Sequence, residues 1–206
     1  MNYHKIAFTD QVKLQQKLNG SRANYQRVED RMEQIELSPM VIKMIEDRDS
    51  FYLATMGENG FPYIQHRGGP KGFLKVLDER TLGFLDFSGN KQYITLGNLK
   101  TNNKVSLILM DYIHRTRLKI YAEAEIKDIT EQNLKSQLDL HYYPNKSERI
   151  ILFHVKAFDW NCPQHITPRY SEEDVADYVK DKDLRINVLE RENANLRAKL
   201  KSFQEN

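Results

Sequence analysis

The sequence predicts a mainly β domain with flanking α-helices, in which an antiparallel β-barrel, closed or nearly closed, is preceded by helices and followed by one long helix. Three observations predict this fold class. Short apolar or alternating segments recur between residues 51 and 155 at spacings typical of hairpins. Apolar side chains recur at helical spacing before them, and a heptad pattern follows them. The expected divisions are N-terminal helices packed on the barrel over residues 1–48, the barrel over 49–170, and a C-terminal helix for dimerisation over 171–206.

Composition excludes several classes of protein. The 206 residues carry 31 Lys and Arg against 29 Asp and Glu, a net charge of +2, whereas binding nucleic acid through bulk charge needs a basic excess. No apolar run approaches the ~20 residues of a membrane span. The first residues lack the apolar stretch of a secretory signal, and the single cysteine, Cys162, excludes an intrachain disulfide. We therefore expect a cytoplasmic protein with neither a nucleic-acid nor a membrane partner.

The first 48 residues predict three helices. Thr9 suits the N-cap of a segment that ends near Asn19-Gly20, where glycine favours termination. Ser38 followed by Pro39 predicts the start of a third helix that runs through residue 45. The helix between them is indicated by one apolar face, formed by Tyr25, Val28, Met32 and Ile35.

Residues 51–87 predict two hairpins. The segment 51–56 is followed by Asn59-Gly60, the strongest short hairpin signal, and the chain returns over 61–65. Segments 72–77 and 82–87 form the second hairpin.

Three further strands and one helix follow. Residues 105–110 are continuously apolar, which predicts a strand buried on both faces. Residues 118–126 alternate between apolar and polar, which predicts a half-buried strand. Thr130 is then expected to cap a short helix that carries Leu134 and Leu138, before a last strand over 150–155.

The C-terminal segment predicts a helix, because Ser171 and Asp174 form the pattern of a capping box. With Ile186 placed at heptad position a, every a and d residue but Asn193 is apolar. A lone asparagine at an a position is a device that specifies register and dimer formation. The a and d residues are Ile186, Leu189, Asn193, Leu196, Leu200 and Phe203.

The charges beside this pattern are those of a parallel dimer. In the g-to-e pairs of such a dimer, the first two pairs are opposite in charge and the third is neutral in effect. A helix lying on its own barrel stays open as the alternative. A DNA-binding basic zipper is excluded because residues 172–177 are acidic. The pairs are Arg185 with Glu190, Glu192 with Arg197, and Lys199 with Gln204.

Two polar stretches at strand ends could bind an anion. In residues 65–72, two adjacent glycines permit close backbone approach to a ligand, and Arg67 offers a fork that fits a phosphate. In residues 86–92, Ser88, Asn90, Lys91, Gln92 and backbone amides could form an anion site. A turn with solvated charges and a polar loop, respectively, are the alternatives.

Two further stretches are less specific. Arg117 and Lys119 share one face of the alternating strand, where a solvent-facing row is the simpler interpretation. Residues 160–165 combine the only Trp and the only Cys with Pro, Gln and His, yet no signature of a thiol enzyme surrounds Cys162. The six histidines lack metal-ligand spacing, so no metal site is expected.

Taken in order, these stretches resemble the FMN-binding split-barrel family related to pyridoxamine 5′-phosphate oxidase, in its uncharacterised branch, over residues 48–168. The resemblance rests on the order and spacing of several stretches together. They are Phe51 to Thr55 with Gly60 to Pro62, Gln65 to Pro70, Leu82 to Gln92, Gly97 to Leu99, Arg117 to Ile120, and Trp160 to His165.

The resemblance implies a six-stranded antiparallel split β-barrel and a homodimer that binds FMN at its interface. It implies an oxidoreductase acting on a small-molecule substrate, with a nicotinamide as candidate electron donor. The resemblance implies that the segment from Trp160 to His165 approaches the flavin from the partner chain. The residues that it assigns to the cofactor are His66, Arg67, Gly68, Lys75, Phe87, Ser88, Asn90, Lys91, Gln92, Arg117, Trp160, Cys162, Pro163 and Gln164.

The substrate side and the chemistry are less defined. His165 and Arg169 are candidates to contact the substrate, and no residue is nominated as catalytic acid or base. The C-terminal substrate-binding pattern of the oxidase is absent, so the substrate stays open. A flavin sensor without turnover, a barrel that binds deazaflavin or haem, and a scaffold without ligand are the alternatives.

Overall fold

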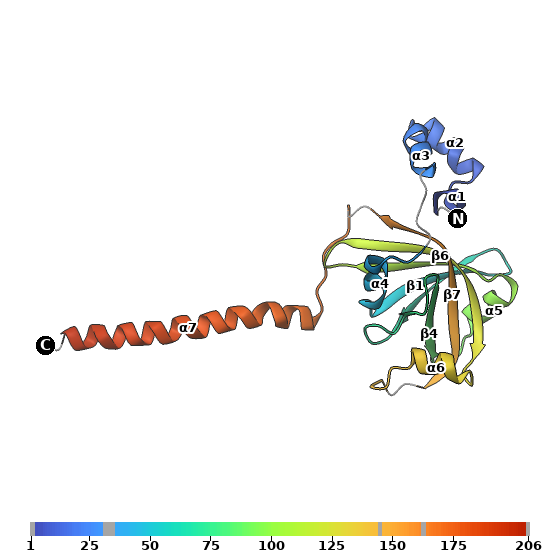
Figure 1. The fold of residues 1–206 in the computed structure, drawn as a ribbon. Coiled ribbons are helices and arrows are strands. Elements are labelled where there is room, and N and C mark those ends of the chain that lie inside the picture. Colours follow the sequence, from blue (N-terminus) through green and yellow to red (C-terminus); the bar gives the residue numbers. More distant parts are fainter. Residues whose placement is uncertain (1–2, 31–35, 144–145, 162–163, 205–206) are drawn as a thin grey trace. The chain divides into compact units, whose positions relative to one another are not determined.

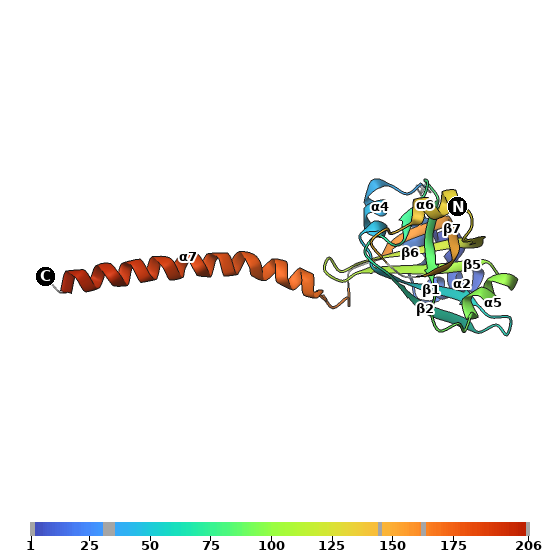
Figure 2. The ribbon, with the colours of Figure 1, turned by 90° about the horizontal axis from the view of Figure 1, so that it is seen from below.

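A computed structural model describes residues 3–30, 36–143, 146–161 and 164–204. The chain divides into two compact units. The first comprises residues 1–111 with 115–166 and contains the sheet (Figures 1 and 2). The second comprises residues 112–114 with 167–206 and contains the long C-terminal helix.

The strands form a mainly β architecture with flanking helices, as predicted. Among the described residues, one antiparallel sheet has the order β2-β1-β5-β6-β7-β4-β3, with β2 and β3 at its edges. The resemblance implied six strands, and the seventh is β3, a two-residue strand that pairs with β4. The strands are β1 (Ser50–Met56), β2 (Pro62–Gly68), β3 (Lys75–Val76), β4 (Thr81–Phe87), β5 (Lys104–Asp111), β6 (Thr116–Asp128) and β7 (Ser147–Asn161).

The core lies inside the curl of this sheet. The alternation predicted over residues 118–126 is confirmed as far as Ala124, since Leu118 and Ile120 on β6 are fully buried while their neighbours are half-buried, but Ile126 is exposed. Aromatic rings fill much of the interior at centroid separations of 5.5–6.0 Å, in stacked and edge-on pairs. These rings belong to Phe51, Phe73, Phe84 and Phe153.

Three strand predictions were wrong in detail. The strand expected over residues 72–77 is reduced to the two residues of β3. β5 is buried on one face, because Val105, Leu107 and Leu109 point into the core while the residues between them are half-buried. β7 is far longer than the expected 150–155, since it pairs with both β4 and β6 and continues past a register shift at Tyr121/Ala122. Apolar content alone does not distinguish a strand with one buried face from a strand with two.

Four of the helices contact strands of the sheet. Thr9 caps α2 through a hydrogen bond from the Val12 amide, and Gly20 follows that helix with φ of 73°, as predicted. Met32 and Ile35 lie outside the described residues. α6 begins one residue later than expected, with Glu131 at the N-cap and Thr130 bonded to Asp128. The helices are α1 (Tyr3–Ala7), α2 (Asp10–Leu18), α3 (Arg22–Glu29), α4 (Pro39–Glu46), α5 (Ile94–Thr101) and α6 (Gln132–Leu138).

The second unit is dominated by α7 (Glu172–Gln204). Its capping box is confirmed: the Ser171 amide donates to Asp174 Oδ2 at 2.8 Å, and the Asp174 amide donates to Ser171 Oγ at 3.1 Å. None of the helices in the described residues combines the length and the apolar character that crossing a bilayer requires.

Candidate functional site

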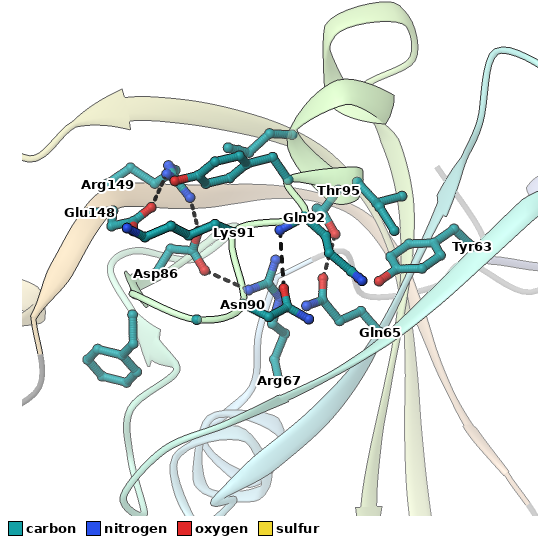
Figure 3. Close-up of a pocket in the computed structure, with 15 residues that line it drawn as sticks. Tyr63, Gln65, Arg67, Asp86, Asn90, Lys91, Gln92, Thr95, Glu148 and Arg149 are labelled. Atoms are coloured by element: carbon teal, nitrogen blue, oxygen red, sulfur yellow. Dashed lines mark hydrogen bonds and ion pairs between the residues drawn. The ribbon is translucent and has the colours of Figure 1, made fainter.

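A pocket of about 200 Å³ opens where β2, the β4–α5 loop and the start of β7 meet (Figure 3). It is lined mainly by polar side chains and by a loop whose backbone adopts left-handed conformations. Its residues are Tyr63, Gln65, Arg67, Asp86, Phe87, Gly89, Asn90, Lys91, Gln92, Tyr93, Ile94, Thr95, Leu96, Glu148 and Arg149.

Strand geometry explains how these side chains converge. Side chains alternate between the two faces of a strand, so Tyr63, Gln65 and Arg67 share one face of β2 and are half-buried. Asp86 lies near the end of β4 and pairs in register with Arg149 on β7. A register shift between Asp86 and Phe87 ends the regular pairing of β4 with β7, and the β4–α5 loop begins there.

Asp86 is the centre of the charge arrangement. Its carboxylate is buried, and each oxygen accepts one guanidinium: Arg67 Nη1 donates to Oδ1 and Arg149 Nη1 donates to Oδ2, both at 2.6 Å (Figure 3). Two cations share one anion, so the cluster keeps an excess positive charge beside the cavity. Arg67 Nε is also buried and finds no hydrogen-bond partner among the described residues.

Glu148 neutralises part of the excess positive charge beside the cavity. It pairs with Arg149, and its pKa is lowered by a hydrogen bond with Ser88, by the Arg149 guanidinium and by the positive charge of Lys91. Burial lowers the pKa of Arg149, but hydrogen bonds to Asp86 and Glu148 outweigh it and raise the pKa above its ordinary value. The pocket therefore holds three cationic side chains against two carboxylates.

The β4–α5 loop supplies backbone and amide groups. Lys91 and Tyr93 adopt positive φ values of 60° and 54°, the left-handed conformation that non-glycine residues seldom adopt. The Gln92 amide donates to Asn90 Oδ1 at 3.2 Å, and the Arg149 guanidinium lies 5.3 Å from the Tyr93 ring centroid. Such turns of alternating hand can direct amides toward an anion.

Two partly buried side-chain hydrogen bonds hold helix α5 beside the pocket. Thr95 Oγ1 donates to Gln65 Oε1 at 2.7 Å, which ties α5 to β2. Asn98 Nδ2 donates to Thr55 Oγ1 at 2.9 Å, which ties α5 to β1. These bonds hold one wall of the cavity in place.

The structure brings together only part of the predicted site. Arg67, Phe87, Asn90, Lys91 and Gln92 line the pocket, and Ser88 belongs to the same loop. These residues come from the two stretches that the sequence singled out at strand ends.

Other predicted residues lie elsewhere in the first unit. His66 is exposed on the opposite face of β2 from Arg67, beside the Tyr52 ring. Gly68 ends β2, and its neighbour Gly69 is approached closely by Phe73, so the glycine pair serves packing in this chain. Lys75 Nζ donates to the Gln137 and Asp139 carbonyls at the end of α6, rather than lining the pocket.

The remaining predicted residues lie on or after the far ends of β6 and β7. Arg117 is half-buried, with Nε unpartnered among the described residues, and Trp160 pairs with Leu118. Gln164 is exposed, and His165 has a φ of 63°. In the second unit, the Arg169 guanidinium lies 4.8 Å from the Tyr112 ring centroid. Cys162 and Pro163 lie outside the described residues.

Sequence reasoning missed Arg149 and Glu148. They begin β7 just before its apolar run, where they read as ordinary charges at a strand end. The pairing of β4 with β7 places Arg149 opposite Asp86 and would have revealed both. Among the described residues, no group of three or more His, Cys, Asp or Glu side chains is arranged to hold a metal ion.

Comparison with known proteins identifies the family. The family model described as pyridoxamine 5′-phosphate oxidase matches residues 37–158, which span the whole sheet up to the last residues of β7. No curated protein matches the chain.

Similar solved structures share low identity with this chain. A putative pyridoxamine 5′-phosphate oxidase from Lactobacillus delbrueckii is 21% identical, with a TM-score of 0.48, over 62% of this chain and 97% of that one. An FMN-binding protein from Syntrophomonas wolfei is 17% identical, with a TM-score of 0.45, over 71% and 97%. An F420 reductase is 20% identical, with a TM-score of 0.44, over 59% and 98%.

Proposed function

This chain belongs to the pyridoxamine 5′-phosphate oxidase family, and from that premise we propose that it is a homodimeric FMN flavoprotein that works as an oxidoreductase. The substrate is a small molecule, and a nicotinamide is the candidate electron donor. We also propose that the protein works in the cytoplasm. Disulfides are rare in that reducing compartment, and a chain with a single cysteine cannot form one within itself.

The observation that carries the proposal is the cluster of Arg67, Asp86 and Arg149 beside the cavity. A phosphate monoester is dianionic and is held best by several charge-assisted donors. Asp86 orients both guanidinium groups without cancelling their charge, and within the described part of the chain the buried Nε of Arg67 has no hydrogen-bond partner. Lys91 and its loop also line the cavity, and the Lys91 ammonium is a further donor for a phosphate.

The size of the cavity supports a phosphate end rather than a whole flavin. Small-molecule pockets usually enclose about 300–1,000 Å³, whereas this one encloses about 200 Å³. The isoalloxazine would therefore need a surface beyond the pocket. In the proposed homodimer, the second copy supplies that surface through the segment from Trp160 to His165, as the resemblance implies, and Arg117 contacts the flavin from its strand.

Each group of residues then has a distinct task. Arg67, Arg149 and Lys91 hold the phosphate, and Gln65 is held by Thr95 at the edge of the cavity. His165 and Arg169 remain the proposed substrate contacts. FMN supplies hydride transfer when bound, and the protein contributes orientation and exclusion of competing reactions.

The visible absorption spectrum of the purified protein tests the proposal, followed by identification of the molecule released on denaturation. One FMN per chain is the expected result. Apoprotein should also bind FMN much more tightly than riboflavin, which lacks the phosphate. Release of deazaflavin or haem would identify that molecule as the cofactor instead of FMN. A colourless protein that does not bind added FMN would overturn the proposal. Tight FMN without reduction by NADH, NADPH or any substrate would favour the sensor.

A further inference from the structure

Helix α7 carries a continuous apolar seam along one side. Its members are spaced alternately by four and three residues, which places them on one narrow stripe of a helix. Each is between 39% and 81% exposed, although such side chains are normally buried. The seam consists of Val175, Val179, Ile186, Leu189, Leu196, Leu200 and Phe203, with Lys182 and Asn193 at its two polar positions.

The structure lengthens the pattern that the sequence indicated. The helix is unbroken from Glu172, so the heptads begin with Val175 at d and Val179 at a, well before Ile186. Its 33 residues span about 50 Å at 1.5 Å per residue. A solvated helix draws most of its stability from packing of an apolar stripe, so the seam needs a partner.

We propose that this partner is α7 of a second copy of the chain, aligned parallel and in register as a two-stranded coiled coil. Asn193 fits the parallel orientation, because a residues then face a residues and the two Asn193 amides can satisfy each other. An antiparallel pair that overlapped along the whole helix would instead place Asn193 opposite Lys182, so the flanking charges decide the orientation.

The flanking charges complement a second copy of the same helix. Arg185 at g faces Glu190 of the partner subunit at e, and Glu192 faces Arg197 of the partner subunit. Opposite charges five residues apart, at g and the following e, contact each other between two parallel helices. They would not be expected in a helix that packed on its own barrel. Ile186 at a, followed by Leu189 and Leu196 at d, also favours two strands over three.

Disulfide cross-linking of the full chain tests the pairing. In a Cys162→Ser background, Phe203→Cys places a thiol at a d position, where parallel helices bring identical residues together. Mild oxidation should convert most of the protein to a linked dimer at micromolar concentration. Val188→Cys, at the outward c position of the same helix, is the control and should stay monomeric on a non-reducing gel. Absence of linkage through Phe203→Cys, or equal linkage in both variants, would overturn the proposal.

A second pair of variants separates true coiling from mere proximity. Leu189→Asp puts a charge in the seam and should abolish linkage through Phe203→Cys. Leu184→Asp introduces the same change at the outward f position, where leucine is 59% exposed, and linkage should persist. Linkage that survives Leu189→Asp would mean that the helix ends merely meet, and the proposal would fail.

Charge exchange provides an independent readout. Arg185→Glu with Arg197→Glu makes both oppositely charged g-to-e pairs acidic, and Glu190→Lys with Glu192→Lys makes both of them basic. Each double variant should link poorly alone, whereas an equal mixture should restore linkage as heterodimer. A mixture that links no better than its components contradicts the pairing. None of these readouts depends on FMN.

Discussion

Arg67 and Asp86, from strands β2 and β4, meet through a 2.6 Å hydrogen bond on a carboxylate that is only 3% exposed. The second oxygen of Asp86 accepts Arg149 at the same distance. The carboxylate therefore joins two segments that flank the cavity and directs both guanidinium groups. It serves as a positioning residue, because it is buried behind the arginines that we expect to touch phosphate.

Asp86→Ala should lower the free energy of unfolding by about 1.5–3 kcal/mol, because two half-buried guanidinium groups lose the carboxylate that they share. Urea denaturation measures this loss. Asp181→Asn, on the exposed surface of α7, is the matched control and should change stability little. A loss below about 1 kcal/mol would mean that water solvates the arginines well enough to make Asp86 dispensable.

Arg67→Ala combined with Lys91→Ala should weaken FMN binding by roughly 10²–10⁴-fold, since each charge-assisted bond contributes about 1.5–3 kcal/mol. Fluorescence titration of apoprotein measures the change. Riboflavin affinity should fall far less, because riboflavin has no phosphate. Lys17→Ala, on the surface of α2, should leave both affinities unchanged. Full FMN affinity in the double variant would rule out this placement of the phosphate.

The part of the site that the sequence predicted is the part encoded locally. The stretches around Arg67 and Lys91 stand out because polar residues cluster directly at strand ends. Arg149 contributes as much charge but becomes relevant only through the pairing of β4 with β7, more than sixty residues apart. Lys75 illustrates the converse: resemblance placed it at the cofactor, whereas its ammonium caps the carbonyls at the end of α6.

Fold prediction shows the same division. The alternation along β6 as far as Ala124 and the capping box at Ser171 are patterns of adjacent residues, and both are confirmed. The length of β7 could not be predicted, because its second half is defined by partners on β6 and interrupted by a register shift. The exposed face of β5 was missed because Ile108 and Met110 are apolar yet only half-buried.

Acid should loosen the N-terminal helices through Glu29. Hydrogen bonds from Lys13 and Arg22 to its carboxylate lower its pKa in the folded state below the ordinary 4.5. The stabilisation is complete above about pH 4.5 and is lost as pH falls through the lower, folded-state pKa. Hydrogen exchange over residues 10–29, corrected for intrinsic rates between pH 7 and 3, should reveal the loss.

Glu29→Gln should make that exchange fast already at pH 7 and remove most of its dependence on acid. Glu58→Gln, in the exposed turn between β1 and β2, is the control and should behave as the parent chain does. Unchanged protection of residues 10–29 in Glu29→Gln would show that the ion pairs do not hold these helices.

Two glycine-to-alanine variants should change stability in opposite directions. A Cβ at Gly83 on β4 would lie 3.0 Å from side-chain carbons of Leu152 and Leu77, so overpacking should cost about 1–3 kcal/mol. A Cβ at Gly97 within α5 meets nothing within 4 Å, and alanine there should add about 0.5–1 kcal/mol through helix propensity. Urea denaturation of both variants measures the two shifts. If both variants changed the free energy of unfolding in the same direction and by the same amount, the close packing around Gly83 would be contradicted. The opposite signs are expected only because Gly83 is crowded and Gly97 is not.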